Sequence, residues 1–422
     1  MVETTTARLP QGSVLGLHDG SVCRFSAIPY AQPPLGPRRF RPPEPSCWRG
    51  ELDARRQGAV APQLPSRLQG AAGDFDAVQS EDCLHLTVWT PGADEKRRPV
   101  LVWLHGGAWQ SGAGALDWYS GEHLARHGDI VVVAPNYRLG ALGWLAAQGQ
   151  TANVGLLDQE AAIAWVTEHI GAFGGDPQNI TVMGQSAGAM SIPCMLMRRP
   201  RFQRAILQSA SLGRGFRPLA QAREIADIYL RAAGANTLDD ARHMPVQALL
   251  EAQRATPVIE WLGSEGAQRS LFAPVADGEV LPLQPEQALH QAAAHVDVLA
   301  GHTFDEMAAF PGMGVNPECH VLGDQIYGEP TRRWAEAATA QKRTAWVYRF
   351  EYRPNETFGA CHCIELPFVF GTVAAFAAAP MLRGMNTHDA TRLTNTMQSA
   401  WLAFVRSGDP GWTPWPHQQV LS

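Results

Sequence analysis

Residues 184–188 read Gly-Gln-Ser-Ala-Gly, a pattern that places one serine between two glycines. A run with β-branched residues at 179–183 precedes it, and small residues that suit a helix follow. A strand that turns sharply into a helix at a serine is a nucleophile elbow, which exposes the hydroxyl at the tip of a sheet. The glycines leave room for chain segments that would crowd a Cβ. The pattern predicts that Ser186 attacks a carbonyl carbon; the alternative is that it only caps the following helix.

The elements that must hold this serine alternate along the chain. Continuous apolar runs are typical of strands buried on both faces, and they occur at residues 99–104, 129–134, 179–183, 205–207, 296–299 and 344–348. Residues 84–89 alternate as a further strand. Residues 158–170 have apolar side chains at helical spacing, and Gly171 is placed to end that helix. Strands that alternate with helices predict an α/β fold with a central, mostly parallel twisted sheet flanked by helices.

The N-terminal part has a different character. Residues 14–30 predict a hairpin with its turn at 18–21, and the Pro-rich residues 31–43 predict an extended connector. The chain of 422 residues is predicted to be one domain, residues 1–422, because α/β folds often exceed the average domain length. Lid-like insertions are expected at approximately residues 57–80, 213–290 and 307–343.

Composition and charge narrow the class of protein. Hydrophobic residues make up 45 % of the chain, enough for a large core, and the formal net charge is −6 without a long basic run. These features argue against nucleic acid and anionic membrane surfaces as partners. No segment approaches the roughly 18 consecutive apolar residues of a membrane span, and residues 1–13 lack the apolar stretch of a signal peptide. The seven cysteines have no regular spacing, so we expect free thiols in a cytoplasmic protein.

Several short blocks follow one another in a characteristic order. They read Ser-Glu-Asp-Cys-Leu at residues 80–84, Trp-Leu-His-Gly-Gly-Ala at 103–108, Asn-Tyr-Arg-Leu-Gly at 136–140, Gly-Leu-Leu-Asp-Gln at 155–159, Phe-Gly-Gly-Asp-Pro at 173–177, Gly-Gln-Ser-Ala-Gly-Ala at 184–189 and His-x-x-Glu-Leu-Pro-Phe at 362–368. With these blocks the chain resembles the type-B carboxylesterase/lipase family of α/β-hydrolases, which includes bacterial carboxylesterases. The resemblance implies an α/β-hydrolase fold with an N-terminal hairpin and reduced lid regions. It also implies a serine carboxylesterase that needs no cofactor or metal and hydrolyses small to medium neutral esters through an acyl-enzyme.

The resemblance also supplies the partners of Ser186. It places the catalytic acid at Glu306, just after an expected strand, and the general base at His362. In α/β-hydrolases the order along the chain is serine, acid, histidine, as here. The carboxylate would fix the imidazole, and the imidazole would take the proton of the hydroxyl. The family has Gly after the acid whereas this chain has Met307, so the neighbouring Asp305 stays open as an alternative acid.

A second part of the machinery would be an oxyanion hole. Negative charge develops on the carbonyl oxygen during acyl transfer, and backbone N–H groups aimed at that oxygen stabilise it. The residue after the nucleophile, Ala187, is one expected donor. The match to the family's glycine-rich run assigns Gly107 and Ala108 as the others, with Gly106 giving the backbone its freedom. The alternative is that these residues form an ordinary turn at the end of a strand.

Three further positions follow from the resemblance. Ser209 and Glu365 resemble supporting positions that lie near the histidine and orient or stabilise it; the alternative is that both are polar core residues. Gln185 stands where the family usually carries Glu, which should weaken any preference for cationic alcohols. Residues 63–80 contain no Trp, so the aromatic site that binds quaternary ammonium in cholinesterases is missing.

Two local features invite other interpretations. Cys361 and Cys363 flank His362 and raise the question of a metal site. Side chains at successive positions of an extended segment cannot all face one ion, so both thiols are expected to be packing residues. Pro193 lies about two turns into the helix after Ser186, where a proline predicts a kink or an early end.

Other functions stay open at this level. The same machinery would serve an amidase, a carbamate hydrolase or a lactonase. Some members of the family lack a working triad and act as non-catalytic binding homologues, but here no triad member is missing. The expected partner is a small-molecule ester, and a pocket with reduced lids would be open or completed by another subunit of a homo-oligomer.

Overall fold

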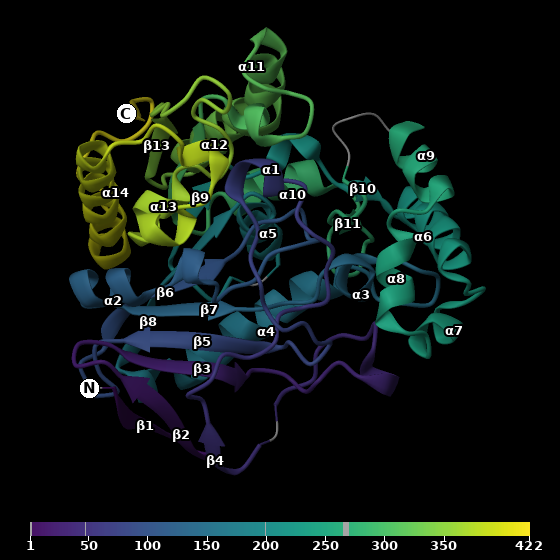
Figure 1. The fold of residues 1–422 in the computed structure, drawn as a ribbon, viewed down its shortest axis with the longest axis horizontal. Coiled ribbons are helices and arrows are strands. Elements are labelled where there is room, and N and C mark those ends of the chain that lie inside the picture. Colours follow the sequence, from purple (N-terminus) through teal and green to yellow (C-terminus); the bar gives the residue numbers. More distant parts are fainter. Residues whose placement is uncertain (1, 47, 199, 265–269) are drawn as a thin grey trace.

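The computed structural model describes residues 2–46, 48–198, 200–264 and 270–422, and a large sheet forms its centre (Figure 1). Within these residues the sheet has 12 strands in the order β1-β2-β3-β5-β7-β6-β8-β9-β12-β13-β14, with β4 beside β2. The strands are β1 (Glu3–Leu9), β2 (Gly12–His18), β3 (Cys23–Pro29), β4 (Gly50–Asp53), β5 (His85–Thr90), β6 (Arg98–Leu104), β7 (Val131–Pro135), β8 (Gly175–Gln185), β9 (Arg204–Gln208), β12 (Asp297–Thr303), β13 (Ala345–Phe350) and β14 (Gln418–Leu421). A small separate pair consists of β10 (Arg217–Pro218) and β11 (Val275–Ala276).

The strands from β7 to β14 in this order run parallel. The sequence does not predict β14, and the predicted apolar runs form the other six of these strands. Their residues are buried on both sides because helices cover both faces. β6 illustrates this, since Val100, Val102 and Leu104 face one hydrophobic core. Leu101 and Trp103 face the other. The prediction of a mostly parallel, doubly covered sheet is confirmed.

The N-terminal strands extend the sheet in antiparallel fashion. The predicted hairpin forms, with β2 antiparallel to β3 and His18 opposite Cys23. The sequence does not predict β1, which pairs with β2 along its whole length. β1 is an edge strand in which Ala7 and Leu9 are buried and most other residues face solvent. A mostly polar edge strand lacks the apolar run that identifies the central strands.

Helices lie on both faces of the sheet and at one end of it (Figure 1). They are α1 (Gln69–Ala72), α2 (Glu122–Gly128), α3 (Gly140–Trp144), α4 (Val154–His169), α5 (Ala187–Leu196), α6 (Leu219–Ala233), α7 (Leu238–Arg242), α8 (Val246–Ala252), α9 (Thr256–Ser264), α10 (Pro285–Ala292), α11 (Pro317–Gly323), α12 (Glu329–Ala340), α13 (Leu366–Phe370) and α14 (Thr387–Ser407). Buried residues of α4, α5 and α10 join the first core, and those of α2, α13 and α14 join the second. α6 to α9 gather on the side of the molecule opposite α14 (Figure 1). In the described part of the chain, no helix is long and apolar enough to cross a membrane.

Two helix ends differ from the sequence prediction. The helix predicted at residues 158–170 forms as α4, which begins earlier, at Val154, and ends at His169. A 3₁₀ turn from Ile170 to Phe173 follows, so Gly171 lies inside that turn. Gly174, with φ 77°, ends that turn instead. Pro193 lies inside α5 without ending it, and the helix runs on to Leu196.

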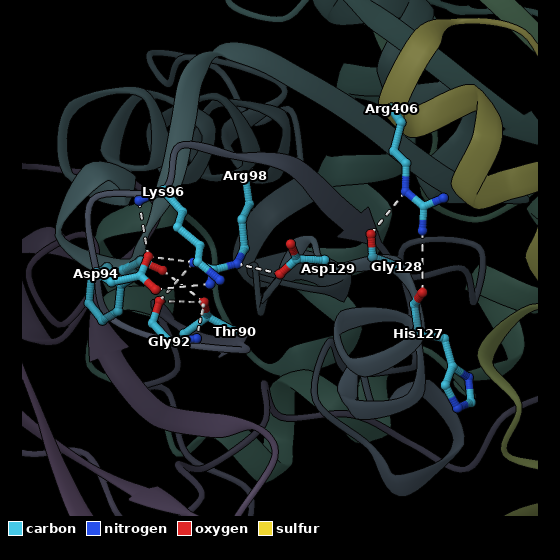
Figure 2. Close-up of polar contacts among 10 residues, drawn as sticks. Thr90, Gly92, Asp94, Lys96, Arg98, His127, Gly128, Asp129 and Arg406 are labelled. Carbon is cyan, nitrogen blue, oxygen red and sulfur yellow. Dashed lines mark hydrogen bonds and ion pairs between the residues drawn. The ribbon is translucent and has the colours of Figure 1, made fainter.

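A cluster of polar contacts lies at the amino end of β6, the end of the strand away from residues 105–108 (Figure 2). The buried Arg98 guanidinium contacts Asp94 Oδ1 at 2.6 Å and Asp129 Oδ1 at 2.7 Å. Arg406 of α14 donates hydrogen bonds to the carbonyl oxygens of Gly128 at 2.9 Å and His127 at 3.2 Å. These contacts join β6, the turn before β7 and α14, and so fix the strands whose other ends carry the predicted site.

Candidate active site

Ser186 lies at the sharp turn between a central strand and a helix. β8 ends at Gln185 and α5 begins at Ala187, and Ser186 between them has φ 54° and ψ −117°. A positive φ is uncommon for a residue with a side chain and costs about 1–3 kcal/mol, which the surrounding structure must offset. A Cβ on Gly188 would lie 2.1 Å from the carbonyl oxygen of Leu104, so a glycine is required there. The strand, turn and helix of the predicted nucleophile elbow are all present.

Parallel strands bring the other predicted residues to the same edge of the sheet. The carboxyl ends of such strands meet at one edge, where the loops of α/β proteins form binding sites. β6 leads into residues 105–108, β8 into Ser186, β12 into Glu306 and β13 toward His362. The topology therefore gathers residues that lie far apart in the sequence.

The carboxylate of Glu306 and the imidazole of His362 form a buried pair. Oε2 of Glu306 accepts a short hydrogen bond from Nδ1 of His362. Oε1 accepts a hydrogen bond of 2.9 Å from the backbone N–H of Thr303. Burial by itself would raise the pKa of Glu306, but His362 and its hydrogen bond hold that pKa below its ordinary value. An ionised carboxylate keeps the imidazole proton on Nδ1, so Nε2 retains the lone pair that a base needs.

The alternative acid, Asp305, has different partners. Its carboxylate accepts hydrogen bonds of 2.7 and 2.9 Å from the guanidinium of Arg353. Its Oδ1 also lies 2.8 Å from Nε2 of His320. Asp305 therefore holds the surrounding loops together, and Glu306 is the carboxylate that contacts the imidazole of His362.

Ser186 and His362 line one cavity, which has a volume of about 220 Å³. Much of its wall comes from the three ranges predicted as lid-like insertions: residues 64–68 from the first, Gln253, Arg254, Ile259, Leu262 and Leu271 from the second, and Phe310 from the third. A larger cavity of about 540 Å³ beside α4 and α5 contains none of the predicted site residues. The smaller cavity, rather than the larger, is therefore where the chemistry of Ser186 would take place.

Of the predicted oxyanion donors, Gly107 and Ala108 line this cavity, and Ala187 directly follows Ser186, which also lines it. In the described residues, no protein atom accepts a hydrogen bond from the N–H groups of Gly107, Ala108 and Ala187. Ala187 begins α5, whose first N–H groups lack partners within the helix and favour a negative charge. A Cβ on Gly107, which has φ 114°, would lie 2.0 Å from the carbonyl oxygen of Ser111, so this turn requires glycine. Gly106 packs against Gln185, whose side-chain oxygen would lie 2.3 Å from a Cβ there.

Gln185 makes a contact that the sequence does not predict. Its side-chain nitrogen Nε2 lies 3.0 Å from Nε2 of His362, and the side chain is buried. The amide N–H can donate to the lone pair that His362 would use as a base. The position next to the nucleophile identifies Gln185 as a site residue, but only the fold reveals that it contacts the histidine.

Comparison with known proteins agrees with this geometry. The model of the carboxylesterase family matches residues 2–321 and 314–420. This chain belongs to the carboxylesterase family. It is 34 % identical over 442 residues to the para-nitrobenzyl esterase of Bacillus subtilis (strain 168), covering 94 % of this chain and 89 % of that protein. It is 39 % identical over 445 residues to a probable N-octanoylanthranilate hydrolase of Rhodococcus erythropolis, covering 98 % and 95 %.

Solved structures show the same architecture. A para-nitrobenzyl (PNB) esterase structure superposes with a TM-score of 0.87 at 32 % identity, covering 99 % of this carboxylesterase and 96 % of that chain. A carboxylesterase from Geobacillus stearothermophilus superposes with a TM-score of 0.81 at 32 % identity, covering 98 % and 93 %. The fold is therefore the α/β-hydrolase fold, and the protein is a serine hydrolase that acts on carboxylic esters. The alternative of a non-catalytic binding homologue loses its basis.

The predicted supporting residues of this carboxylesterase lie beside Glu306. Ser209 follows β9 with φ 48°, is buried, and its hydroxyl helps to lower the pKa of Glu306. Glu365 is also buried and accepts a hydrogen bond of 3.0 Å from Nε2 of Gln208. Burial and the negative charge of Glu306 raise the pKa of Glu365 to about 7. Both residues are close enough to Glu306 to interact with its carboxylate, and neither lines the cavity.

The two cysteines that flank His362 are buried free thiols. Burial raises the pKa of each thiol well above its ordinary value, so neither is a thiolate at neutral pH. Among the described residues, no group of three or more His, Cys, Asp and Glu side chains could hold a metal ion. Cys361 and Cys363 join the second core as apolar packing residues.

Proposed function

We propose that this carboxylesterase hydrolyses small to medium esters with Ser186 as nucleophile, His362 as base and Glu306 as acid. The observation that carries the proposal is the Glu306–His362 contact at the wall of the cavity that Ser186 also lines. Nε2 of His362 takes the proton of the Ser186 hydroxyl while the oxygen attacks the ester carbonyl. The π electrons of the ester carbonyl move onto the carbonyl oxygen, which becomes the oxyanion.

The N–H groups of Gly107, Ala108 and Ala187 would bind that oxyanion. When the tetrahedral intermediate collapses, the ester C–O bond breaks and the protonated His362 gives its proton to the leaving alcohol. Water, deprotonated in turn by His362, then attacks the acyl-enzyme and releases the carboxylic acid. Ser186 regains its proton, so the cycle consumes one ester and one water.

The size of the substrate follows from the cavity. A volume of about 220 Å³ lies below the range of about 300–1,000 Å³ that is typical of sites for drug-sized ligands. It suits a short or medium acyl group. A cytoplasmic location and self-association into a homo-oligomer remain predictions from the sequence, as does the action of the three insertions as lids.

A series of p-nitrophenyl esters with increasing acyl length tests the proposal. The wild type should turn over the shorter members, and Ser186→Ala should lose at least about a thousandfold in kcat. Turnover by Ser186→Ala close to that of the wild type would exclude this nucleophile.

Amide hydrolysis is the second candidate. The relative from Rhodococcus erythropolis, 39 % identical, is named for an N-octanoyl substrate. A matched ester and N-acyl amide of the same acid, assayed with the same enzyme preparation, would separate the two bond types.

A further inference from the structure

The lining of the active-site cavity has an unusual charge balance. The whole chain has 40 Asp and Glu residues against 34 Lys and Arg residues. The cavity wall nevertheless contains Arg67 and Arg254, and none of its residues in the described part of the chain is Asp or Glu. An acidic protein therefore presents a locally positive surface at the place where its substrate must bind.

A third arginine lies near the same cavity. The guanidinium carbons of Arg67 and Arg214 each lie 5.9 Å from the centre of the Phe310 ring. The Phe310 ring in turn lies 5.6 Å from the His362 ring, centre to centre. The positive charges are thus close enough to the base to act on a substrate that occupies the cavity.

The side chains of Arg67 and Arg254 have no carboxylate partner among the described residues. Arginines elsewhere in the chain do pair, as Arg98 does with Asp94 and Asp129 (Figure 2). Ion pairs within the described residues include no contact of Arg67 or Arg254. Both residues nevertheless keep much of their surface in solvent.

Arg67 and Arg214 also repel each other. Arg67 keeps part of its surface in solvent, yet enough protein surrounds its guanidinium for desolvation to lower its pKa, and the charge of Arg214 lowers it further. Two like charges held close together destabilise the protein unless an anion lies near both. Such an arrangement is retained at binding sites, where stability is commonly lost in favour of function.

We propose that the preferred substrates of this carboxylesterase are esters that carry a free carboxylate away from the scissile bond. The inference rests on the proposed function of Ser186 and adds the charge of the substrate to it. The carboxylate would contact Arg67 or Arg254 while the ester carbonyl lies at Ser186. It can belong to the acyl part, as in a monoester of a dicarboxylic acid, or to the alcohol part, as in an ester of a phenolic acid.

Two pairs of substrates distinguish these sources. Mono-4-methylphenyl glutarate and 4-methylphenyl pentanoate have acyl chains of equal length and differ in a terminal carboxylate. 4-Acetoxybenzoate and 4-methylphenyl acetate differ in a carboxylate on the alcohol part. Initial rates are measured in a pH-stat, with the uncatalysed rate subtracted, at low and at high ionic strength.

In at least one pair, kcat/KM should be about tenfold higher for the anionic ester at low salt, and the ratio should fall as salt screens the charges. Arg67→Gln or Arg254→Gln should reduce that ratio by about fivefold or more, because kcat/KM should fall further for the anionic ester than for its neutral partner. Arg8→Gln, an equal change of charge on the edge strand β1, should leave the ratio unchanged.

The neutral esters separate the possible failures. Turnover of neutral esters that depends on Ser186, with a ratio of one or less in both pairs, would overturn the anionic preference and leave the proposed function intact. If the ratio of kcat/KM for the anionic ester over the neutral ester is the same in the double variant Arg67→Gln/Arg254→Gln as in the wild type, the anionic preference would also be overturned. If the wild type does not hydrolyse the neutral esters, that result would instead count against the proposed function.

Discussion

The side-chain nitrogen of Gln185 lies 3.0 Å from Nε2 of His362, the atom that accepts the proton of Ser186 in the proposed mechanism. Both ring nitrogens of His362 therefore have a partner, the Glu306 carboxylate at Nδ1 and the Gln185 amide at Nε2. An uncharged amide at this position stabilises the neutral imidazole and adds no negative charge to the cavity.

Gln185→Glu should reverse both effects. A carboxylate beside Nε2 stabilises the protonated imidazole, so the acid limb of the kcat/KM profile should move to higher pH. The same carboxylate should favour cationic alcohols. We expect the ratio of kcat/KM for acetylthiocholine over its uncharged 3,3-dimethylbutyl analogue to rise about fivefold or more. An unchanged profile and ratio would mean that residue 185 does not act on the base.

Glu306→Gln should impair catalysis without removing binding. The variant no longer fixes the imidazole tautomer or stabilises the imidazolium, so kcat should fall about a thousandfold or more with a small change in KM. Asp305→Asn is the matched control next to it. This substitution removes the charge that pairs with Arg353. Asp305→Asn should therefore lower the free energy of unfolding by about 2–4 kcal/mol and retain most of kcat. The opposite pattern would identify Asp305 as the acid.

Glu365 should make stability depend on pH. Its pKa is raised from 4.5 to about 7 in the folded protein, so the folded state holds a proton that the unfolded state releases. The contribution is fully present below pH 4.5 and is lost as pH rises through about 7. Glu365→Gln removes this dependence and can still accept from Gln208. In urea titrations, the free energy of unfolding of Glu365→Gln minus that of the wild type should therefore increase by about 3 kcal/mol from pH 4 to pH 9. A constant difference would contradict the raised pKa.

Gly107→Ala should disrupt the oxyanion site. Its Cβ would lie 2.0 Å from the carbonyl oxygen of Ser111 at φ 114°, so the turn that aims the N–H groups must shift. A loss of one oxyanion donor typically costs about 10²–10³ in kcat. Gly20→Ala is the control, since Gly20 also has a positive φ but open space around it. It should leave kcat unchanged, and an equal loss in both variants would show that strain alone, not the oxyanion site, is responsible.

The sequence predicts the parts of the site that depend on local pattern. β8, Ser186 and α5 form a contiguous elbow, and the apolar runs identify the central strands. Glu306 and His362 are 56 residues apart, and their pairing follows from the family's chain order rather than from local spacing. The sequence does not predict the polar edge strand β1 or the start of α4 at Val154, because neither has a strong local signal.

Contacts between distant side chains could not be predicted. Gln185 and His362 are 177 residues apart, and their contact depends on how the loop after β13 folds back over β8. The positive lining has the same origin, since Arg67, Arg214 and Arg254 belong to different segments. The fold brings Arg67 and Arg254 to the wall of one cavity, and it brings Arg214 to the ring of Phe310 beside them.

Covalent trapping tests the central claim most directly. A p-nitrophenyl phosphonate ester mimics the tetrahedral intermediate and should release one equivalent of nitrophenolate per chain as it phosphonylates the nucleophile. Peptide mass analysis should locate the label on Ser186, with no labelling in Ser186→Ala and slower labelling in Glu306→Gln. A stoichiometric label on any other residue, or undiminished labelling of Ser186→Ala, would contradict the account.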